Sequence, residues 1–356
     1  MARFKEIYIK SADPFERGVQ HGSQVSAEIE KICRGYRRSF SKNGYTWEEA
    51  QAMAMESVPL LERALPELME EARGIARGAG VPLPVVMLLN SRYELLKFSK
   101  GEACEACPED AECTLYGVEP SASAGKETIV GQNWDNAPFI GEDLYVLHID
   151  EGNGNRILAL TEPGQLVRSG MNSQGLGLAC ATLLSTHDRP GAAVPTNFLR
   201  RRLLQCRSMA EAENILRDFR PKVSLNYLVG SAGDKKVRLW ETNPLENYPI
   251  ATAQGVLGHG NDFLANPRID RFHPERGRQF RGQRLWYLLA KRSGSITPET
   301  VMEALRDHEG HPGSICNHCP EDGLKTIAST IYCLDRGSAY LCWGNPCESE
   351  YELYTL

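Results

Sequence analysis

The amino-acid sequence predicts an α+β fold in which antiparallel sheets are covered by helices. Helical apolar spacing dominates the segment 13–98, and apart from a short strand over residues 6–10 the strand-like patterns appear after residue 113. Two helical segments then separate one group of strands from a second group near the end of the chain. Because this order differs from the βαβ alternation of parallel-sheet proteins, we expect layered antiparallel sheets.

The first third of the chain is expected to be mainly helical. A short strand is predicted over residues 6–10, and Asp13 followed by Pro14 is typical of a helix start, with Asp13 as the N-cap. The acidic stretch 99–112 is rich in small residues and is predicted to be a surface loop. Between them, helical segments are predicted over residues 20–40, 47–79 and 84–98, with the middle one broken at Pro59 and Pro66.

The rest of the chain alternates between groups of strands and pairs of helices. Strands are predicted over residues 127–133, 143–149, 156–162, 176–182, 224–231, 236–242, 326–334, 338–343 and 350–355. Helices are predicted over residues 196–206, 208–219, 279–292 and 298–308.

Composition narrows the classes of protein to which the chain belongs. Its 356 residues carry a net charge of −6 with no basic or acidic tail, which argues against a nucleic-acid partner. No apolar run approaches the roughly 18 residues of a membrane-spanning helix, and the start has no signal-peptide pattern. We therefore expect a cytoplasmic protein. Its 11 cysteines are then expected to be free thiols, ligands or nucleophiles.

One cysteine stands out by its context. Cys113 follows the loop 99–112, and the next predicted strand ends in Asn133-Trp134-Asp135. A thiol with an ordinary pKa near 8.5 is only a few per cent thiolate at neutral pH. An α-amine has a pKa near 7.7–8.0 and is a useful base. Cutting the chain before Cys113 would therefore place base and nucleophile on one residue.

Several motifs together resemble the acyl-coenzyme A:6-aminopenicillanic acid acyltransferase family, peptidase family C45, within the N-terminal nucleophile (Ntn) hydrolases. The most specific is Gly131-Gln132-Asn133-Trp134-Asp135, and it is supported by the segments 15–22, 73–79, 86–94, 170–176 and 344–348. The resemblance implies a four-layer αββα sandwich with two antiparallel sheets between helical layers. It also implies that residues 1–356 form a single domain.

The resemblance further implies an autoprocessed cysteine amidohydrolase or acyltransferase. The Cys113 thiol would attack the carbonyl of Glu112 and split the chain into fragments 1–112 and 113–356, which stay associated. Cys113 would then cleave a small amide or thioester and pass the acyl group to water or to an amine. The expected partner is a small acylated amine or amino acid, or an acyl-CoA. No cofactor is required, and a homo-oligomer is compatible with the sequence.

The resemblance assigns roles to further residues. Asp135 would hold the new α-amine, the Asn261 side chain would donate to the oxyanion, and backbone near Ala181 would supply a second donor. Tyr116 and Trp134 would contact substrate. Two positions depart from the family: Lys325 stands where an arginine that pairs with the aspartate is usual, and Glu112 replaces a glycine before the scissile bond.

Two Cys-x-x-Cys pairs leave an alternative open. Cys104 with Cys107 and Cys316 with Cys319 are compatible with unconnected loop thiols, a four-thiolate zinc site or disulfides. They allow a zinc-dependent or zinc-stabilised amidase as an alternative function, and a non-catalytic binding homologue is a third. The remaining cysteines in apolar surroundings are predicted to be core residues, namely Cys33, Cys180, Cys206, Cys333 and Cys342.

Overall fold

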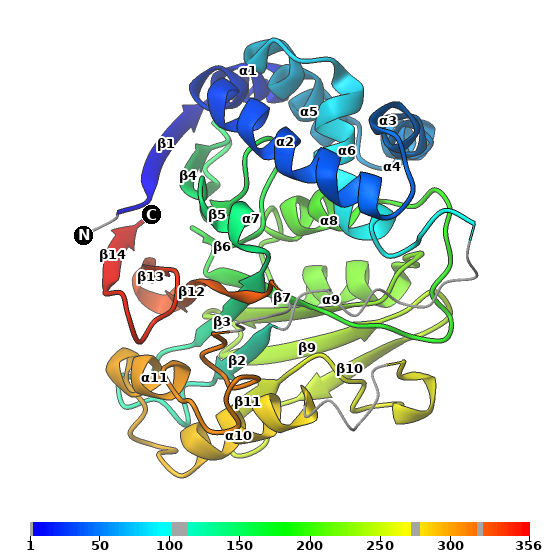
Figure 1. Ribbon diagram of the computed structural model, residues 1–356. Coiled ribbons are helices and arrows are strands. Elements are labelled where there is room, and N and C mark those ends of the chain that lie inside the picture. Colours follow the sequence, from blue (N-terminus) through cyan, green and yellow to red (C-terminus); the bar gives the residue numbers. More distant parts are fainter. Residues whose placement is uncertain (1–2, 102–112, 272–277, 319–322) are drawn as a thin grey trace.

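Two β-sheets lie face to face between helical layers in the computed structural model, which describes residues 3–101, 113–271, 278–318 and 323–356 (Figure 1). The larger sheet has the strand order β1-β4-β5-β6-β7-β8-β9-β10. Its strands are β1 (Lys5–Lys10), β4 (Tyr145–Asp150), β5 (Arg156–Thr161), β6 (Ser169–Asn172), β7 (Leu176–Thr182), β8 (Leu225–Ser231), β9 (Lys236–Thr242) and β10 (Asn247–Ala251).

The smaller sheet has six strands in the order β11-β2-β3-β12-β13-β14. Its strands are β2 (Thr114–Val118), β3 (Ile129–Asn136), β11 (Val256–His259), β12 (Lys325–Cys333), β13 (Ser338–Trp343) and β14 (Tyr351–Thr355). All described pairings in both sheets are antiparallel except β1 with β4, which run parallel.

Helices cover the outer faces of both sheets (Figure 1). The larger sheet's side carries α1 (Pro14–Gln24), α2 (Ser26–Lys42), α3 (Trp47–Met55), α4 (Val58–Ala64), α5 (Pro66–Ala79), α6 (Leu83–Leu95), α8 (Thr196–Leu203) and α9 (Met209–Asp218). The helices α10 (Arg278–Ala290) and α11 (Pro298–Leu305) pack on the smaller sheet, and the short α7 (Pro138–Gly141) follows β3. The predicted four-layer sandwich is therefore confirmed.

The apolar interior follows these layers. One continuous cluster joins the facing sides of the sheets to the helices of the larger sheet, and a second fills the space between the smaller sheet and α10–α11. The sheets approach closely at Gly177 of β7, where an added Cβ would lie 2.5 Å from Leu334 and 2.7 Å from Val130. A larger residue would therefore push the two sheets apart.

A buried ion-pair network fixes the helical layer. Glu71 of α5 pairs with Arg17 of α1 at 3.2 Å and with Arg201 of α8 at 3.0 Å, and Arg201 also contacts Glu151 at 2.7 Å. The helices α1 and α5 cross so closely that a Cβ on Gly18 would lie 2.0 Å from the Glu71 carbonyl oxygen. These contacts hold α1 and α5 against α8.

The predicted elements differ from the observed ones in a few places. The breaks expected at Pro59 and Pro66 are present: the segment 47–79 forms three helices, and the two prolines lie in the first turns of α4 and α5. The segment 20–40 spans the end of α1 and most of α2. Strands β2, β6, β10 and β11 were not predicted. No helix in the described residues is both long and apolar enough to cross a membrane.

Candidate active site

Cys113 lies immediately before β2, at the inner face between the two sheets. Its side chain is fully buried and belongs to the same apolar cluster as Leu115 and Trp134. The thiol Sγ lies 4.0 Å from the Asp135 carbonyl oxygen and 4.0 Å from Arg168 Nη2. Burial raises the pKa of the Cys113 thiol, while the Arg168 charge acts in the opposite direction. The thiol therefore needs a base before it can act as a nucleophile.

Asp135 lies on β3, with Thr326 of β12 as its register partner. Its carboxylate is fully buried and accepts a hydrogen bond from the Thr326 hydroxyl at 2.7 Å. The other carboxylate oxygen forms an ion pair with Arg281 Nη1 at 3.0 Å, and both side chains are completely shielded from solvent. A buried carboxylate held in this way stays fixed in position and orientation.

Arg281 joins the two polar residues that the sequence singled out. Its Nη1 contacts Asp135, and its Nη2 donates to Asn261 Oδ1 at 2.8 Å. The Asn261 amide nitrogen donates in turn to the Thr182 carbonyl oxygen at 2.9 Å. The result is a buried chain of Thr326, Asp135, Arg281 and Asn261 that runs across the smaller sheet towards the end of β7.

The loop that carries Asn261 is held by a second buried pair. His259, the last residue of β11, contacts Glu241 Oε1 through Nε2 at 2.8 Å. Burial lowers the pKa of His259, but the hydrogen bond and charge of Glu241 outweigh this and raise the pKa overall. The same carboxylate accepts the backbone N–H groups of Leu264 at 2.7 Å and Ala265 at 3.0 Å. Glu241 thus holds the chain in place both before and after Asn261.

Arg168 forms the opposite wall of the site. Its guanidinium carbon lies 4.6 Å from the centre of the Trp134 ring, and its Nη2 donates to the Cys180 carbonyl oxygen at 3.1 Å. Burial and the neighbouring Arg200 lower the pKa of Arg168 to about 10. Ala181 lies between Cys180 and Thr182, whose carbonyls accept the bonds from Arg168 and Asn261. The structure therefore brings Trp134 and Ala181 to the site.

Two predicted site residues lie elsewhere. Tyr116 is on the opposite face of β2 from Cys113, in the apolar layer beneath α10, where its hydroxyl donates to the Thr330 carbonyl oxygen at 3.0 Å. Because side chains alternate along a strand, Tyr116 points away from the Cys113 thiol, and its contact with substrate stays a prediction. Lys325 begins β12 opposite Asn136, whereas the described arginine that pairs with Asp135 is Arg281. The pairing with Asp135 that was expected of Lys325 is therefore made by Arg281.

Sequence reasoning missed Arg281 and Arg168. Arg281 shares α10 with Arg278 and Arg284 at three-residue spacing, and that spacing alone does not show which arginine is buried. Arg168 precedes β6, a strand that the sequence did not reveal. Only the fold brings these side chains to Cys113.

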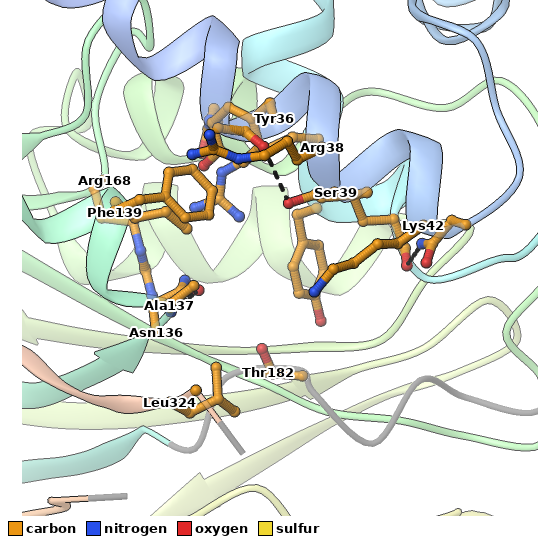
Figure 2. Close-up of a pocket in the computed structure, with 18 of the residues that line it drawn as sticks. Tyr36, Arg38, Ser39, Lys42, Asn136, Ala137, Phe139, Arg168, Thr182 and Leu324 are labelled. Atoms are coloured by element: carbon orange, nitrogen blue, oxygen red, sulfur yellow. Dashed lines mark hydrogen bonds between the residues drawn. The ribbon is translucent and has the colours of Figure 1, made fainter. Parts of the chain in front are cut away.

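A pocket with a volume of about 360 Å³ opens beside this cluster (Figure 2). Figure 2 shows Tyr36, Ser39 and Lys42 of α2 on one side, with Thr182 and Leu324 on the other. Cationic side chains from three helices and from the segment before β6 line it, and none of its lining residues in the described ranges carries a carboxylate. These cations are Arg38, Lys42, Arg92, Arg168 and Arg200.

The predicted cysteine ligands are only partly described. Cys104, Cys107 and Cys319, together with Glu112, lie outside the described residues. Cys316 is described, and its nearest sulfur partner there is Cys347 at 3.5 Å. The five cysteines predicted to be core residues are all buried, as expected.

A buried thiol, a carboxylate and an amide gathered beside a pocket between facing sheets define a candidate nucleophilic enzyme site. The family model described as acyl-coenzyme A:6-aminopenicillanic acid acyl-transferase matches residues 123–348. The chain therefore belongs to this family. A relative from Emericella nidulans, the acyl-coenzyme A:6-aminopenicillanic-acid-acyltransferase 40 kDa form, is 28% identical over 329 residues, spanning 90% of this chain and 86% of that protein.

Solved structures show more distant likenesses. A conjugated bile acid hydrolase from Clostridium perfringens has a TM-score of 0.43 and 14% identity, covering 68% of this chain and 97% of that one. Penicillin V acylase from Agrobacterium tumefaciens has a TM-score of 0.38 and 13% identity, covering 66% of this chain and 75% of that one. These similarities are too low to support an argument about the site.

Proposed function

We propose that the chain is a self-cleaving cysteine hydrolase of the Ntn type that acts on small amides. The observation that supports this most directly is the buried chain Asp135–Arg281–Asn261 beside the thiol of Cys113. It supplies a fixed carboxylate for an α-ammonium group and a fixed amide for an oxyanion, with a pocket alongside.

In the maturation step, the Cys113 thiol attacks the carbonyl of Glu112 and forms a thioester as the peptide C–N bond breaks, and the thiol proton passes to the departing nitrogen, which becomes the α-amine. Water then hydrolyses the thioester, which releases the carboxylate of residue 112 and regenerates the thiol. Cys113 now carries a free α-amine, which Asp135 holds through its charge. The products are fragments 1–112 and 113–356, and the ion pairs of Glu71 with Arg201 help to keep them together.

In the catalytic step, the α-amine accepts the proton of the Cys113 thiol, and the thiolate attacks the substrate amide carbonyl. The Asn261 side chain stabilises the oxyanion, with backbone near Ala181 as the second donor. The amine leaves after receiving the proton, and water hydrolyses the acyl-enzyme. Transfer of the acyl group to an amine would follow the same course with the amine in place of water.

The pocket favours a substrate with an anionic group. Arg168 Nη1 and Arg200 Nε are buried atoms with no hydrogen-bond partner among the described residues. Buried donors are rarely left unpaired, and guanidinium groups pair well with carboxylates. Phe139 and Leu324 add apolar surface to the same pocket. An acylated amino acid, with an apolar acyl part and a free carboxylate, fits both features.

Mass spectrometry of the denatured, freshly purified protein tests self-cleavage. We expect two fragments that end at Glu112 and begin at Cys113, and an intact chain in the Cys113→Ala variant. An intact wild-type chain whose amidase activity survives Cys113→Ala would refute the proposal.

Substrate preference is tested with an acylated amino acid and its carboxamide. The free acid should be preferred by the wild-type protein, and Arg200→Met should remove the preference by raising KM for the acid. Arg202 is the matched control, because it lies on the same helix and pairs with Glu211 at the surface. If Arg202→Met removes the preference for the free acid as fully as Arg200→Met does, the assignment of Arg200 to the substrate carboxylate is wrong.

A further inference from the structure

Two histidines and two cysteines converge outside the candidate active site. His308 follows α11, Cys316 and His318 lie in the segment before β12, and Cys347 follows β13. Each offers one ligand atom, and these four atoms lie within 4.8 Å of one another. Residues from two separate loops therefore meet at one point.

The distances among these atoms match a tetrahedral metal site. Bond lengths of about 2.3 Å for zinc–sulfur and 2.0–2.1 Å for zinc–nitrogen place tetrahedral ligands about 3.3–3.8 Å apart. The two sulfurs lie 3.5 Å apart, and the Nε2 atoms of His308 and His318 lie 3.0 Å apart. His318 Nε2 lies 3.5 Å from Cys316 Sγ and 3.1 Å from Cys347 Sγ. The arrangement needs only small adjustments to surround an ion.

The surrounding groups support metal ligation. His318 Nδ1, on the far side of the ring from the cluster, lies 3.6 Å from Glu348 Oε1. A carboxylate behind a ligating histidine fixes the ring and strengthens it as a ligand. The Asn345 amide donates to Cys316 Sγ at 3.5 Å, a contact that favours a thiolate. Both neighbours are of the kind that supports a metal-bound histidine and a metal-bound thiolate.

We propose that His308, Cys316, His318 and Cys347 bind one zinc ion. Two thiolates and two imidazoles form a set that favours zinc, and each thiol gives up its proton on binding. All four positions are filled by protein atoms, so no position remains for a catalytic water. The site is therefore structural, and it uses only one member, Cys316, of the cysteine set suggested by the sequence.

The proposed zinc site is connected to the candidate active site through hydrogen bonds. Asn317 lies between two ligands, and its backbone N–H donates to the Thr326 hydroxyl at 3.0 Å. That hydroxyl donates to Asp135 at 2.7 Å. The zinc ion would tie the segment that orders Thr326 to the turn at Cys347. Metal loss should therefore lower stability and disturb Asp135 together.

Metal analysis of the full-length chain tests the proposal. We expect about one zinc per chain in the wild-type protein, and less than about a tenth of that in His308→Ala and in Cys347→Ser. His311 is the matched control, because its ring lies 6.1 Å from that of His318 but is not one of the four ligands. His311→Ala should keep the zinc. Cobalt substitution should give the visible bands of a tetrahedral site with thiolate charge transfer.

The experiment is repeated in the Cys113→Ala variant, so that its outcome does not depend on self-cleavage. A chelator should lower the unfolding temperature of both proteins, and added zinc should restore it. Three results would overturn the proposal: a metal-free protein with reduced thiols, a disulfide between Cys316 and Cys347, or equal loss of zinc in His308→Ala and His311→Ala.

Discussion

Replacing Arg281 with methionine should damage the site more than any other single change on α10. The guanidinium is completely shielded from solvent and pairs with the equally shielded Asp135. Removing one partner of a buried ion pair leaves an uncompensated charge and typically costs about 3–5 kcal/mol. The hydrogen bond to Asn261 is lost as well. We therefore expect Arg281→Met to lower the free energy of unfolding by about 3–5 kcal/mol.

The stability measurement is best made in a Cys113→Ala background, where every variant is one intact chain. Urea unfolding then compares Arg281→Met, Asp135→Asn and the double variant. The double variant should lose less than the sum of the single losses, because no unpaired carboxylate remains. Turnover is measured in proteins that retain Cys113. There, Arg281→Met should displace Asn261 and reduce turnover by about 10²–10³-fold. Arg281→Lys should recover only part of it, because lysine lacks the planar fork that reaches both residues.

Arg284 provides the matched control for this series. It lies one turn further along α10, is 20% exposed, and pairs with Asp307 at 2.8 Å near the surface. Arg284→Met should change the free energy of unfolding by no more than about 1 kcal/mol. If Arg281→Met has as small an effect as Arg284→Met on both unfolding and turnover, then the bridge between Asp135 and Asn261 has no mechanistic role.

Three further changes test the fold itself. Gly18→Ala should lower stability by at least about 1–3 kcal/mol in urea unfolding, because its Cβ would collide with the backbone of α5. Glu71→Gln removes the carboxylate that pairs with Arg17 and one of the two carboxylates that pair with Arg201, and it should cost about 3–5 kcal/mol in the same assay; an unchanged midpoint would contradict the network. Burial lowers the pKa of His21 to about 4, so the unfolded chain binds a proton that the native chain does not between about pH 6.5 and 4. Stability should therefore fall by about 3 kcal/mol as the pH falls through this window, and His21→Gln should flatten that part of the pH profile.

Local signals in the sequence predicted local structure well. Asp13 accepts hydrogen bonds from the backbone N–H groups of Phe15 at 2.8 Å and Glu16 at 3.4 Å, as expected of an N-cap before Pro14. Strand β2 gave no such signal. All five of its residues are buried, so the alternation of polar and apolar side chains that marks a half-exposed strand is absent.

Long-range partners could not be predicted in the same way. Arg281 and Asp135 are 146 residues apart in the sequence, and their contact depends on how α10 packs against the smaller sheet. The same holds for Cys316 and Cys347, which are 31 residues apart. The short spacing of Cys316 and Cys319 directed attention to a local pair. The family resemblance pointed to Asp135 and Asn261, but the arginine that connects them emerges only from the fold.

The environment of Cys113 bears on which base can activate it. Burial raises the pKa of its thiol, so the thiolate is scarcer there than for a free cysteine. No histidine in the described residues hydrogen-bonds this thiol, and His259 is engaged with Glu241. A base must therefore come from elsewhere. An α-amine on Cys113 itself would lie within reach of the thiol and beside Asp135, with a pKa near 7.7–8.0 before any shift. In the uncut chain such a thiol would still attack the neighbouring Glu112 carbonyl within the same chain, but its attack on a separate substrate would need the base that cleavage supplies. The activity of the proposed enzyme should then appear in step with the fragment that begins at Cys113.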